Sequence, residues 1–142
     1  MKILVLNGPN LNLLGERETE IYGEDSLVDI NFSLEDTYPE VDFTFIQSNS
    51  EGDLITWIQN SEGENDGIVL NPAAYTHTSV AIRDAISSVS VPVVEVHLSN
   101  LFKREESFRQ LSLTAGVSKG VISGFGKFSY FLAVEFFLRE SS

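Results

Sequence analysis

Hydrophobic residues gather along the chain in five short runs that predict β-strands. They lie at residues 3–6, 43–47, 67–70, 93–98 and 120–123. Most of these runs are nearly continuous in apolar residues instead of alternating with polar ones. Continuous runs of this length are typical of strands that are buried on both faces of a parallel sheet.

Between the runs, apolar residues recur with the spacing of an α-helix. Helices are predicted at residues 26–38, 53–60, 79–89 and 129–140. In the first of them Leu27, Ile30 and Leu34 share one face, and Ser26 precedes them as an N-cap residue. Alternating strands and helices imply right-handed crossovers and a doubly wound sheet. We therefore predict an α/β fold, a flavodoxin-like three-layer sandwich with a five-stranded parallel sheet.

The last predicted helix is apolar on nearly all sides. A helix of this kind is usually buried on more than one face. Two explanations stay open here: a thick core within one chain, or contact with another subunit.

Length and composition exclude several classes of protein. With 142 residues, the chain is expected to form a single domain over residues 1–142. It has no cysteine, which excludes a disulfide framework, a thiolate nucleophile and a cysteine-ligated metal. No apolar run approaches the roughly 20 residues that a membrane span needs. Since no export signal precedes the first strand, we expect a cytoplasmic protein that has no membrane partner.

The formal net charge of −12 argues against a nucleic-acid partner. The phosphate backbone demands clusters of Lys and Arg, and the chain has nine of these residues in all. The acidity is explained by a solvated surface. Against this background, an arginine within a loop motif is a candidate for binding an anion.

The first apolar run leads into a long polar loop, residues 7–23. Connections in α/β folds usually span about two to six residues, so a loop of this length favours a function. Loops at the carboxyl ends of parallel strands are also where such sheets bind ligands. This loop holds Asn10, Arg17 and Tyr22. A guanidinium beside a phenol favours the phenolate, which is the basic form of tyrosine.

The segment after the third run, residues 71–79, contains Asn71 and His77. One interpretation is a simple turn in which Ser79 caps the next helix. The functional interpretation places Asn71 and His77 at the carboxyl edge of the sheet, facing the first loop.

The fourth run carries Glu95 and His97, two residues apart and therefore on one face of the strand. A carboxylate and an imidazole on a buried strand are unfavourable unless they pair. A glutamate that orients a working histidine explains the pair, and a purely structural pair is the alternative. Where the strand ends, the backbone of Leu98 and the hydroxyl of Ser99 are suited to bind a carboxylate.

Together these loops supply a potential base, a potential acid and several polar binders. The sequence offers no phosphate-binding glycine loop with a lysine, no metal cluster and no Ser-His-Asp spacing. The charged residues 104–109, and the pair of Arg83 with Asp84, are explained by solvated surface. The set suits proton abstraction beside a carbonyl followed by loss of a leaving group.

The motifs themselves resemble a known family. Residues 7–15 with Arg17 and 22–23 are similar to the opening signature of type II 3-dehydroquinate dehydratases. The resemblance continues in order through residues 47–52, 71–79, 95–100 and 120–126. It implies anti elimination of water from 3-dehydroquinate to give 3-dehydroshikimate through an enolate, without a cofactor or metal. This reaction belongs to the shikimate pathway to chorismate and aromatic amino acids. The resemblance also implies trimers that assemble four at a time into a homododecamer.

The resemblance implies a role for each matching residue. Tyr22 removes a proton from C2 of the substrate, Arg17 keeps Tyr22 ionised, and His97, with Glu95 behind it, protonates the departing hydroxyl. Asn10 and Asn71 fix the water that stabilises the enolate. The remaining substrate-binding residues are Asn71, Leu98 and Ser99 for the carboxylate, and His77, Arg109 and a neighbouring subunit's Asp84 for the ring hydroxyls.

The base assignment agrees with elementary chemistry. A free tyrosine has a pKa of about 10 and is a poor base near neutrality. An adjacent guanidinium lowers such a value by about one to three units in a partly dry site. One departure from the family pattern concerns Arg109, because the segment 104–109 is one residue longer than usual.

Three alternatives use the same fold. A flavin- or nucleotide-binding module needs a phosphate loop after the first strand, where Pro9 and Leu11 make a poor one. A phospho-acceptor domain needs acidic residues where Asn7 and Asn71 stand. A catalytically inactive family member is disfavoured by the joint presence of Tyr22 and His97.

Overall fold

The protein is built around one parallel sheet with the strand order β2-β1-β3-β4-β5. The computed structural model describes residues 1–16 and 18–141. The strands are β1 (Lys2–Asn7), β2 (Asp42–Gln47), β3 (Gly67–Asn71), β4 (Val93–His97) and β5 (Gly120–Ser123). Each pair of neighbouring strands is parallel. The order reverses direction beside β1, as in a doubly wound sheet.

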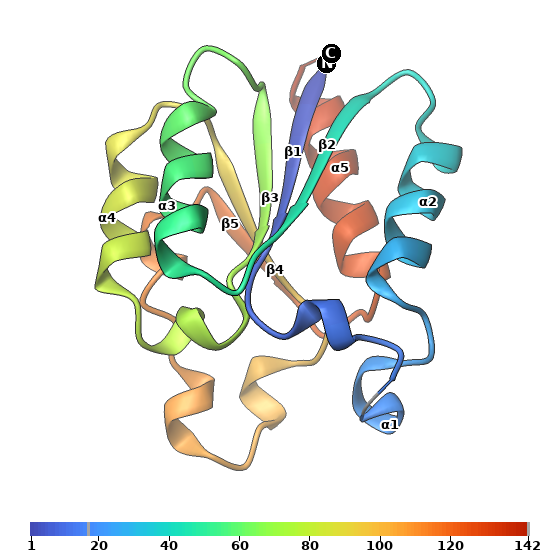
Figure 1. Ribbon diagram of the computed structural model, residues 1–142, viewed down its shortest axis with the longest axis vertical. Coiled ribbons are helices and arrows are strands. Elements are labelled where there is room, and N and C mark those ends of the chain that lie inside the picture. Colours follow the sequence, from blue (N-terminus) through green and yellow to red (C-terminus); the bar gives the residue numbers. More distant parts are fainter. Residues whose placement is uncertain (17, 142) are drawn as a thin grey trace.

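Helices cover both faces of the sheet, which gives three layers (Figure 1). The longer helices are α2 (Leu27–Thr37), α3 (Glu51–Asn60), α4 (Val80–Ser88) and α5 (Phe128–Glu140). Helices α2 and α5 lie on one face, and α3 and α4 lie on the other. Each face has its own apolar cluster, one around Val5, Val69 and Tyr130 and one around Leu6, Leu70 and Ile82.

Serine side chains start three of these helices. The Ser26 hydroxyl accepts the Asp29 N–H, and the Asp29 carboxylate accepts the Ser26 N–H, so α2 begins with a complete capping box. Ser50 and Ser79 cap α3 and α4 in the simpler way. These contacts fix where each helix begins after its loop.

The predicted α/β sandwich is confirmed. All five predicted strands are present with ends within one residue of the prediction, and α3 begins two residues earlier than predicted, at Glu51. The prediction missed the short helix α1 (Thr19–Tyr22) inside the first loop. It also missed five 3-10 helices: η1 (Leu11–Leu13), η2 (Ala73–His77), η3 (Leu101–Lys103), η4 (Ser107–Gln110) and η5 (Ala115–Val117). Such short turns carry too few residues to show a helical period.

Helix α5 has two different faces. Tyr130, Val134 and Phe137 are buried against the sheet, whereas Phe128 and Leu132 are 59% and 45% exposed. The thick core therefore accounts for only part of the apolar surface of this helix. No helix in the described part of the chain is long and apolar enough to cross a membrane.

Gly67 permits the close packing of α5 on β3. A Cβ atom at this buried position would lie 2.7 Å from the Phe137 ring. We therefore expect Gly67→Ala to lower the free energy of unfolding by about 1–3 kcal/mol, measured by urea denaturation. Gly120→Ala is the matched control, because a Cβ atom there meets no atom within 4 Å. Equal stability of the two variants would contradict the packing argument.

Candidate active site

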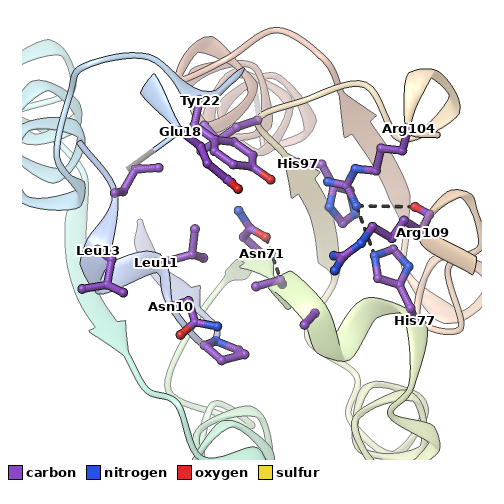
Figure 2. A pocket seen from close by; sticks show the side chains of 15 residues that line it. Asn10, Leu11, Leu13, Glu18, Tyr22, Asn71, His77, His97, Arg104 and Arg109 are labelled. Atoms are coloured by element: carbon purple, nitrogen blue, oxygen red, sulfur yellow. Dashed lines mark hydrogen bonds between the residues drawn. The ribbon is translucent and has the colours of Figure 1, made fainter. Parts of the chain in front are cut away.

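The loops that follow β1, β3 and β4 meet at one edge of the sheet and enclose a cleft (Figures 1 and 2). This is the carboxyl edge, where parallel sheets bind their ligands. The cleft is lined by Pro9, Asn10, Leu11, Leu13, Leu14, Glu18, Tyr22, Asn71, Ala73, Ala74, His77, His97, Leu98, Arg104 and Arg109. The first loop thus contributes Tyr22, and the sheet contributes Asn71 and His97.

The cleft draws side chains from both faces of the sheet. Asn71 follows Val69 by two residues, so its side chain lies on the α2/α5 face. His97 lies two residues after Glu95 and four after Val93, which packs on the α3/α4 face. At the end of the sheet, groups from opposite faces can therefore reach one ligand.

The backbone is strained where the first two loops touch. Gly8 donates its N–H to the Asn71 carbonyl at 2.8 Å, and a Cβ atom on Gly8 would lie 2.5 Å from the Pro72 carbonyl oxygen. Asn10, Glu18 and Ala73 all have positive φ angles, of 69°, 49° and 55°. All three line the cleft. Residues other than glycine adopt this conformation rarely, and such strain gathers at functional sites.

Glu95 and His97 form a buried pair on β4. His97 Nε2 lies 2.8 Å from Glu95 Oε2, and the two side chains are 2% and 0% exposed. The hydroxyls of Ser112 and Thr114 also donate to this carboxylate. Burial alone raises the pKa of the Glu95 carboxyl, but the contacts from His97, Thr114 and Ser112 outweigh it and lower the pKa.

The pair fixes the tautomer of His97. An ionised Glu95 can only accept, so His97 Nε2 carries a proton and Nδ1 is the nitrogen left for the cleft. Neutral His97 can accept through Nδ1, and the imidazolium can donate there. A ring held in this orientation can accept or donate a proton at Nδ1, which suits general acid–base catalysis.

Arg104 lies in the cleft and was not predicted. The segment 104–109 was interpreted as solvated surface, and for Arg104 this is wrong. Its guanidinium donates to Ser99 Oγ at 3.1 Å and lies 3.1 Å from His77 Nε2. Burial lowers the pKa of Arg104, and attraction to Tyr22 works in the opposite direction. Arg104, which follows β4, and Tyr22, which follows β1, thus line the same cleft.

His77 is held as the neutral Nδ1–H tautomer. Nδ1 lies 2.6 Å from the Leu111 carbonyl oxygen and must donate to it, so Nε2 accepts from Arg104. Burial lowers the pKa of His77, with the nearby charges of Arg104 and Arg109 adding to the effect. The Nε2 lone pair is the only acceptor on this ring.

The other residues predicted for the site differ in where they lie relative to the cleft. Arg17 lies outside the described residues. Asp84 is exposed on α4 and does not line the cleft of its own chain. The Ser99 hydroxyl accepts a hydrogen bond from Arg104. Arg109 lines the cleft, forms an ion pair with Glu106 at 3.0 Å and lies over the ring of Phe108.

Three further residues were missed or misread. Ser112 and Thr114 hold Glu95, yet nothing in their sequence context distinguishes them from ordinary loop residues. Arg83 is not part of an exposed pair, because its guanidinium donates to the Leu113 carbonyl at 2.6 Å.

Among the described residues, no group of three or more His, Cys, Asp or Glu side chains could hold a metal ion.

Comparisons with known proteins give a consistent family. The family model for class II dehydroquinase matches residues 1–138. The chain is 54% identical to the 3-dehydroquinate dehydratase of Clostridium botulinum strain Loch Maree, over 99% of this chain and 96% of that protein. It is also 54% identical to the one from Aliarcobacter butzleri, over 94% and 82%. The crystal structure of the type II dehydroquinase from Butyrivibrio crossotus superposes with a TM-score of 0.93 at 44% identity, covering 97% of both chains.

The buried carboxylate generates a prediction about stability and pH. The pKa of Glu95 is lower in the folded than in the unfolded chain, where it is about 4.3. Ionised Glu95 therefore stabilises the fold above that pH, and the stabilisation is lost as the pH falls through the lower, folded pKa. We expect Glu95→Gln to lower the free energy of unfolding at pH 7 by about 1–3 kcal/mol.

Urea denaturation at several pH values measures this difference. It should shrink below about pH 4, where the unaltered protein loses its advantage. Glu35→Gln, on the exposed side of α2, is the control and should change little at any pH. A difference that stays constant down to acid pH would contradict the assignment of an ionised Glu95.

Proposed function

The chain belongs to the class II dehydroquinase family, and from this premise we propose how its cleft works. Members of the family are 3-dehydroquinate dehydratases, which are hydro-lyases of the shikimate pathway. They remove water from 3-dehydroquinate and give 3-dehydroshikimate. The comparisons offer no support for the alternative of a flavin- or nucleotide-binding module. The observation that carries our proposal is that Tyr22 and His97 line one cleft, with Glu95 behind His97.

We assign the base to Tyr22. Its phenolate takes the proton from C2, beside the ketone, and leaves an enolate. Arg17 is proposed to keep Tyr22 ionised, because a guanidinium beside a phenol favours the phenolate. Arg104 is a second cation that lines the same cleft.

We assign the acid to His97. The imidazolium delivers its Nδ1 proton to the hydroxyl that leaves from C1, while Nε2–H stays on Glu95. The hydrogen bond to the buried carboxylate holds the orientation of the ring through the step. Because the base comes from the first loop and the acid from the end of β4, proton removal and hydroxyl departure can occur on different sides of the ring.

The enolate and the substrate groups need donors as well. We propose that Asn10 and Asn71 fix a water at the enolate oxygen, since fixed donors at a developing charge are a large part of such catalysis. Asn71, the Leu98 backbone and the Ser99 hydroxyl bind the substrate carboxylate. Binding of the ring hydroxyls is assigned to His77, Arg109 and Asp84 of a neighbouring subunit.

The assembly is also part of the proposal. We propose a homododecamer, a tetramer of trimers, in a cytoplasmic protein whose residues 1–142 form one domain. Exposed Phe128 and Leu132 on α5 are apolar surface that a partner copy can cover. The exposed position of Asp84 on α4 agrees with a residue that serves the cleft of a neighbour. A cysteine-free chain needs no oxidising compartment.

The proposed activity is tested directly by mixing the protein with 3-dehydroquinate and following the ultraviolet absorbance of the enone product. A chelator is included so that a contaminating metal enzyme does not contribute. In this assay Tyr22→Phe should lower kcat by about 10²–10⁴-fold and leave KM nearly unchanged, because only the proton acceptor is lost.

Tyr75→Phe is the matched control for Tyr22→Phe. The Tyr75 hydroxyl donates to the Asn49 carbonyl at 2.8 Å and does not line the cleft, so its loss should leave kcat near that of the unaltered protein. If Tyr22→Phe turns over as fast as Tyr75→Phe, another group is the base.

Asp84→Ala tests the contribution of a neighbouring subunit. We expect KM to rise about tenfold, the effect of losing one hydrogen bond to a charged group, while the oligomer stays intact by light scattering. Asp36→Ala on the exposed side of α2 is the control. An unchanged KM in an intact oligomer removes Asp84 from the site.

A further inference from the structure

Tyr130 on α5 is the largest completely buried side chain in the described part of the chain, and its hydroxyl lies beneath the cleft. We propose that Tyr130 is a positioning residue that holds the amide of Asn71 with one N–H free for the ligand. The inference rests on the proposed function, because it deepens the role given there to Asn71. Tyr130 itself does not line the cleft.

A series of hydrogen bonds joins the ends of two neighbouring strands, β1 and β3, to helix α5. Asn71 Nδ2 lies 3.0 Å from the Tyr130 hydroxyl, and that hydroxyl lies 2.6 Å from Asn7 Oδ1. Asn71 Oδ1 accepts the Ala73 N–H at 3.1 Å. Asn7 and Asn71 are register partners on β1 and β3, so one phenol reaches both. All three side chains are at most 4% exposed.

The direction of these hydrogen bonds is fixed at one end by the backbone N–H of Ala73. The Ala73 N–H can only donate, so the Asn71 atom that faces it is the oxygen. The Asn71 nitrogen therefore faces Tyr130 and donates to it. The phenol has one proton, which it gives to Asn7 Oδ1. If these hydrogen bonds ran in the opposite direction, the Asn71 amide nitrogen would face the Ala73 N–H, and two donors would meet.

This direction leaves one donor for the cleft. An amide nitrogen has two protons, and Tyr130 takes only one of those on Asn71. In Figure 2 the Asn71 nitrogen lies on the side of Glu18 and Tyr22, and the oxygen turns away from them toward the bond with Ala73. Asn71 thus presents a donor, not an acceptor, beside the base. A donor is what a substrate carboxylate or an enolate-bound water requires.

The backbone supports the same conclusion. Ala73 aims its N–H at Asn71 from a left-handed conformation with φ 55°, which an alanine adopts at a cost. Two independent contacts, one from a strained backbone and one from Tyr130, thus hold a single amide in one orientation. Stability of the core alone would require neither the strained backbone at Ala73 nor the bond to Tyr130.

The competing explanation is that Tyr130 merely satisfies its own buried hydroxyl. Tyr38 offers the comparison, because it packs in the same apolar cluster and is 7% exposed. Its hydroxyl lies 3.4 Å from Glu135 Oε1 and 3.5 Å from the Phe131 carbonyl oxygen, away from the cleft. A structural role predicts similar behaviour of the two tyrosines toward activity.

The experiment compares Tyr130→Phe with Tyr38→Phe in the 3-dehydroquinate assay, with thermal unfolding measured on both. Each loses one hydroxyl and keeps its ring. We expect kcat/KM to fall about ten- to a hundredfold in Tyr130→Phe, because a reacting group is no longer held in place, and to stay unchanged in Tyr38→Phe. Both variants should lose some thermal stability.

A double-mutant cycle shows whether Tyr130 acts through Asn71. In an Asn71→Ala background, Tyr130→Phe should have little further effect on kcat/KM, since the amide it positions is absent. Independent, multiplying losses would overturn the inference, and so would full activity of folded Tyr130→Phe. If the unaltered protein does not dehydrate 3-dehydroquinate, the proposed function itself fails first.

Asn7→Ala keeps the test decisive if Tyr130→Phe does not fold. It removes the acceptor of the phenol proton and leaves Tyr130 and Asn71 in place. We expect a smaller loss of kcat/KM, about threefold to tenfold, because Tyr130 is then oriented less firmly. Unchanged kcat/KM in this variant would overturn the inference as well.

Discussion

The carboxylate of Glu95 is the constraint on which the site depends. It is completely buried in the middle of β4, where an unpaired charge would oppose folding by several kcal/mol. His97 on the same strand supplies one donor, and Ser112 and Thr114 supply the other two from a loop far along the chain. The loop therefore has to lie against the sheet for the charge to be satisfied. Arg104 and Arg109 belong to the same connection between β4 and β5, so one buried charge also determines where two cations stand.

A second constraint is that the two faces of the sheet contribute side chains to one cleft at its carboxyl edge. Within the sheet, Asn71 and His97 belong to opposite faces and could never meet. Beyond the last backbone hydrogen bonds, both reach one cleft. The close contact of Gly8 with the Asn71 carbonyl draws the first loop over that cleft, since only a residue without a Cβ atom fits there. The strained φ angles of Asn10 and Ala73 are consistent with loops held in place by these contacts.

The sequence predicted what local pattern controls. Continuous apolar runs identified the strands, and the spacing of Glu95 and His97 on one run predicted a shared face. The structure confirms both of these. Ser112 and Thr114 could not be predicted, because their partner lies 17 and 19 residues away along the chain. Tyr130 and Asn7 are 123 residues apart, and only the packing of α5 on the sheet brings them together. Arg104 resembles any residue in a charged surface segment until burial and its contacts with His77 and Ser99 are known.

Arg104 also determines which groups of the cleft can bind a ligand. The ring of His77 has one acceptor, Nε2, because its Nδ1–H donates to the Leu111 carbonyl. Arg104 donates to that acceptor. If His77 is to accept a hydrogen bond from a ring hydroxyl through Nε2, the guanidinium has to move aside. Ser99 differs, because its hydroxyl oxygen can accept from Arg104 and still donate its proton to a carboxylate. Ser99 can therefore bind a carboxylate with Arg104 in place, whereas His77 can accept from a ring hydroxyl only after the guanidinium has moved.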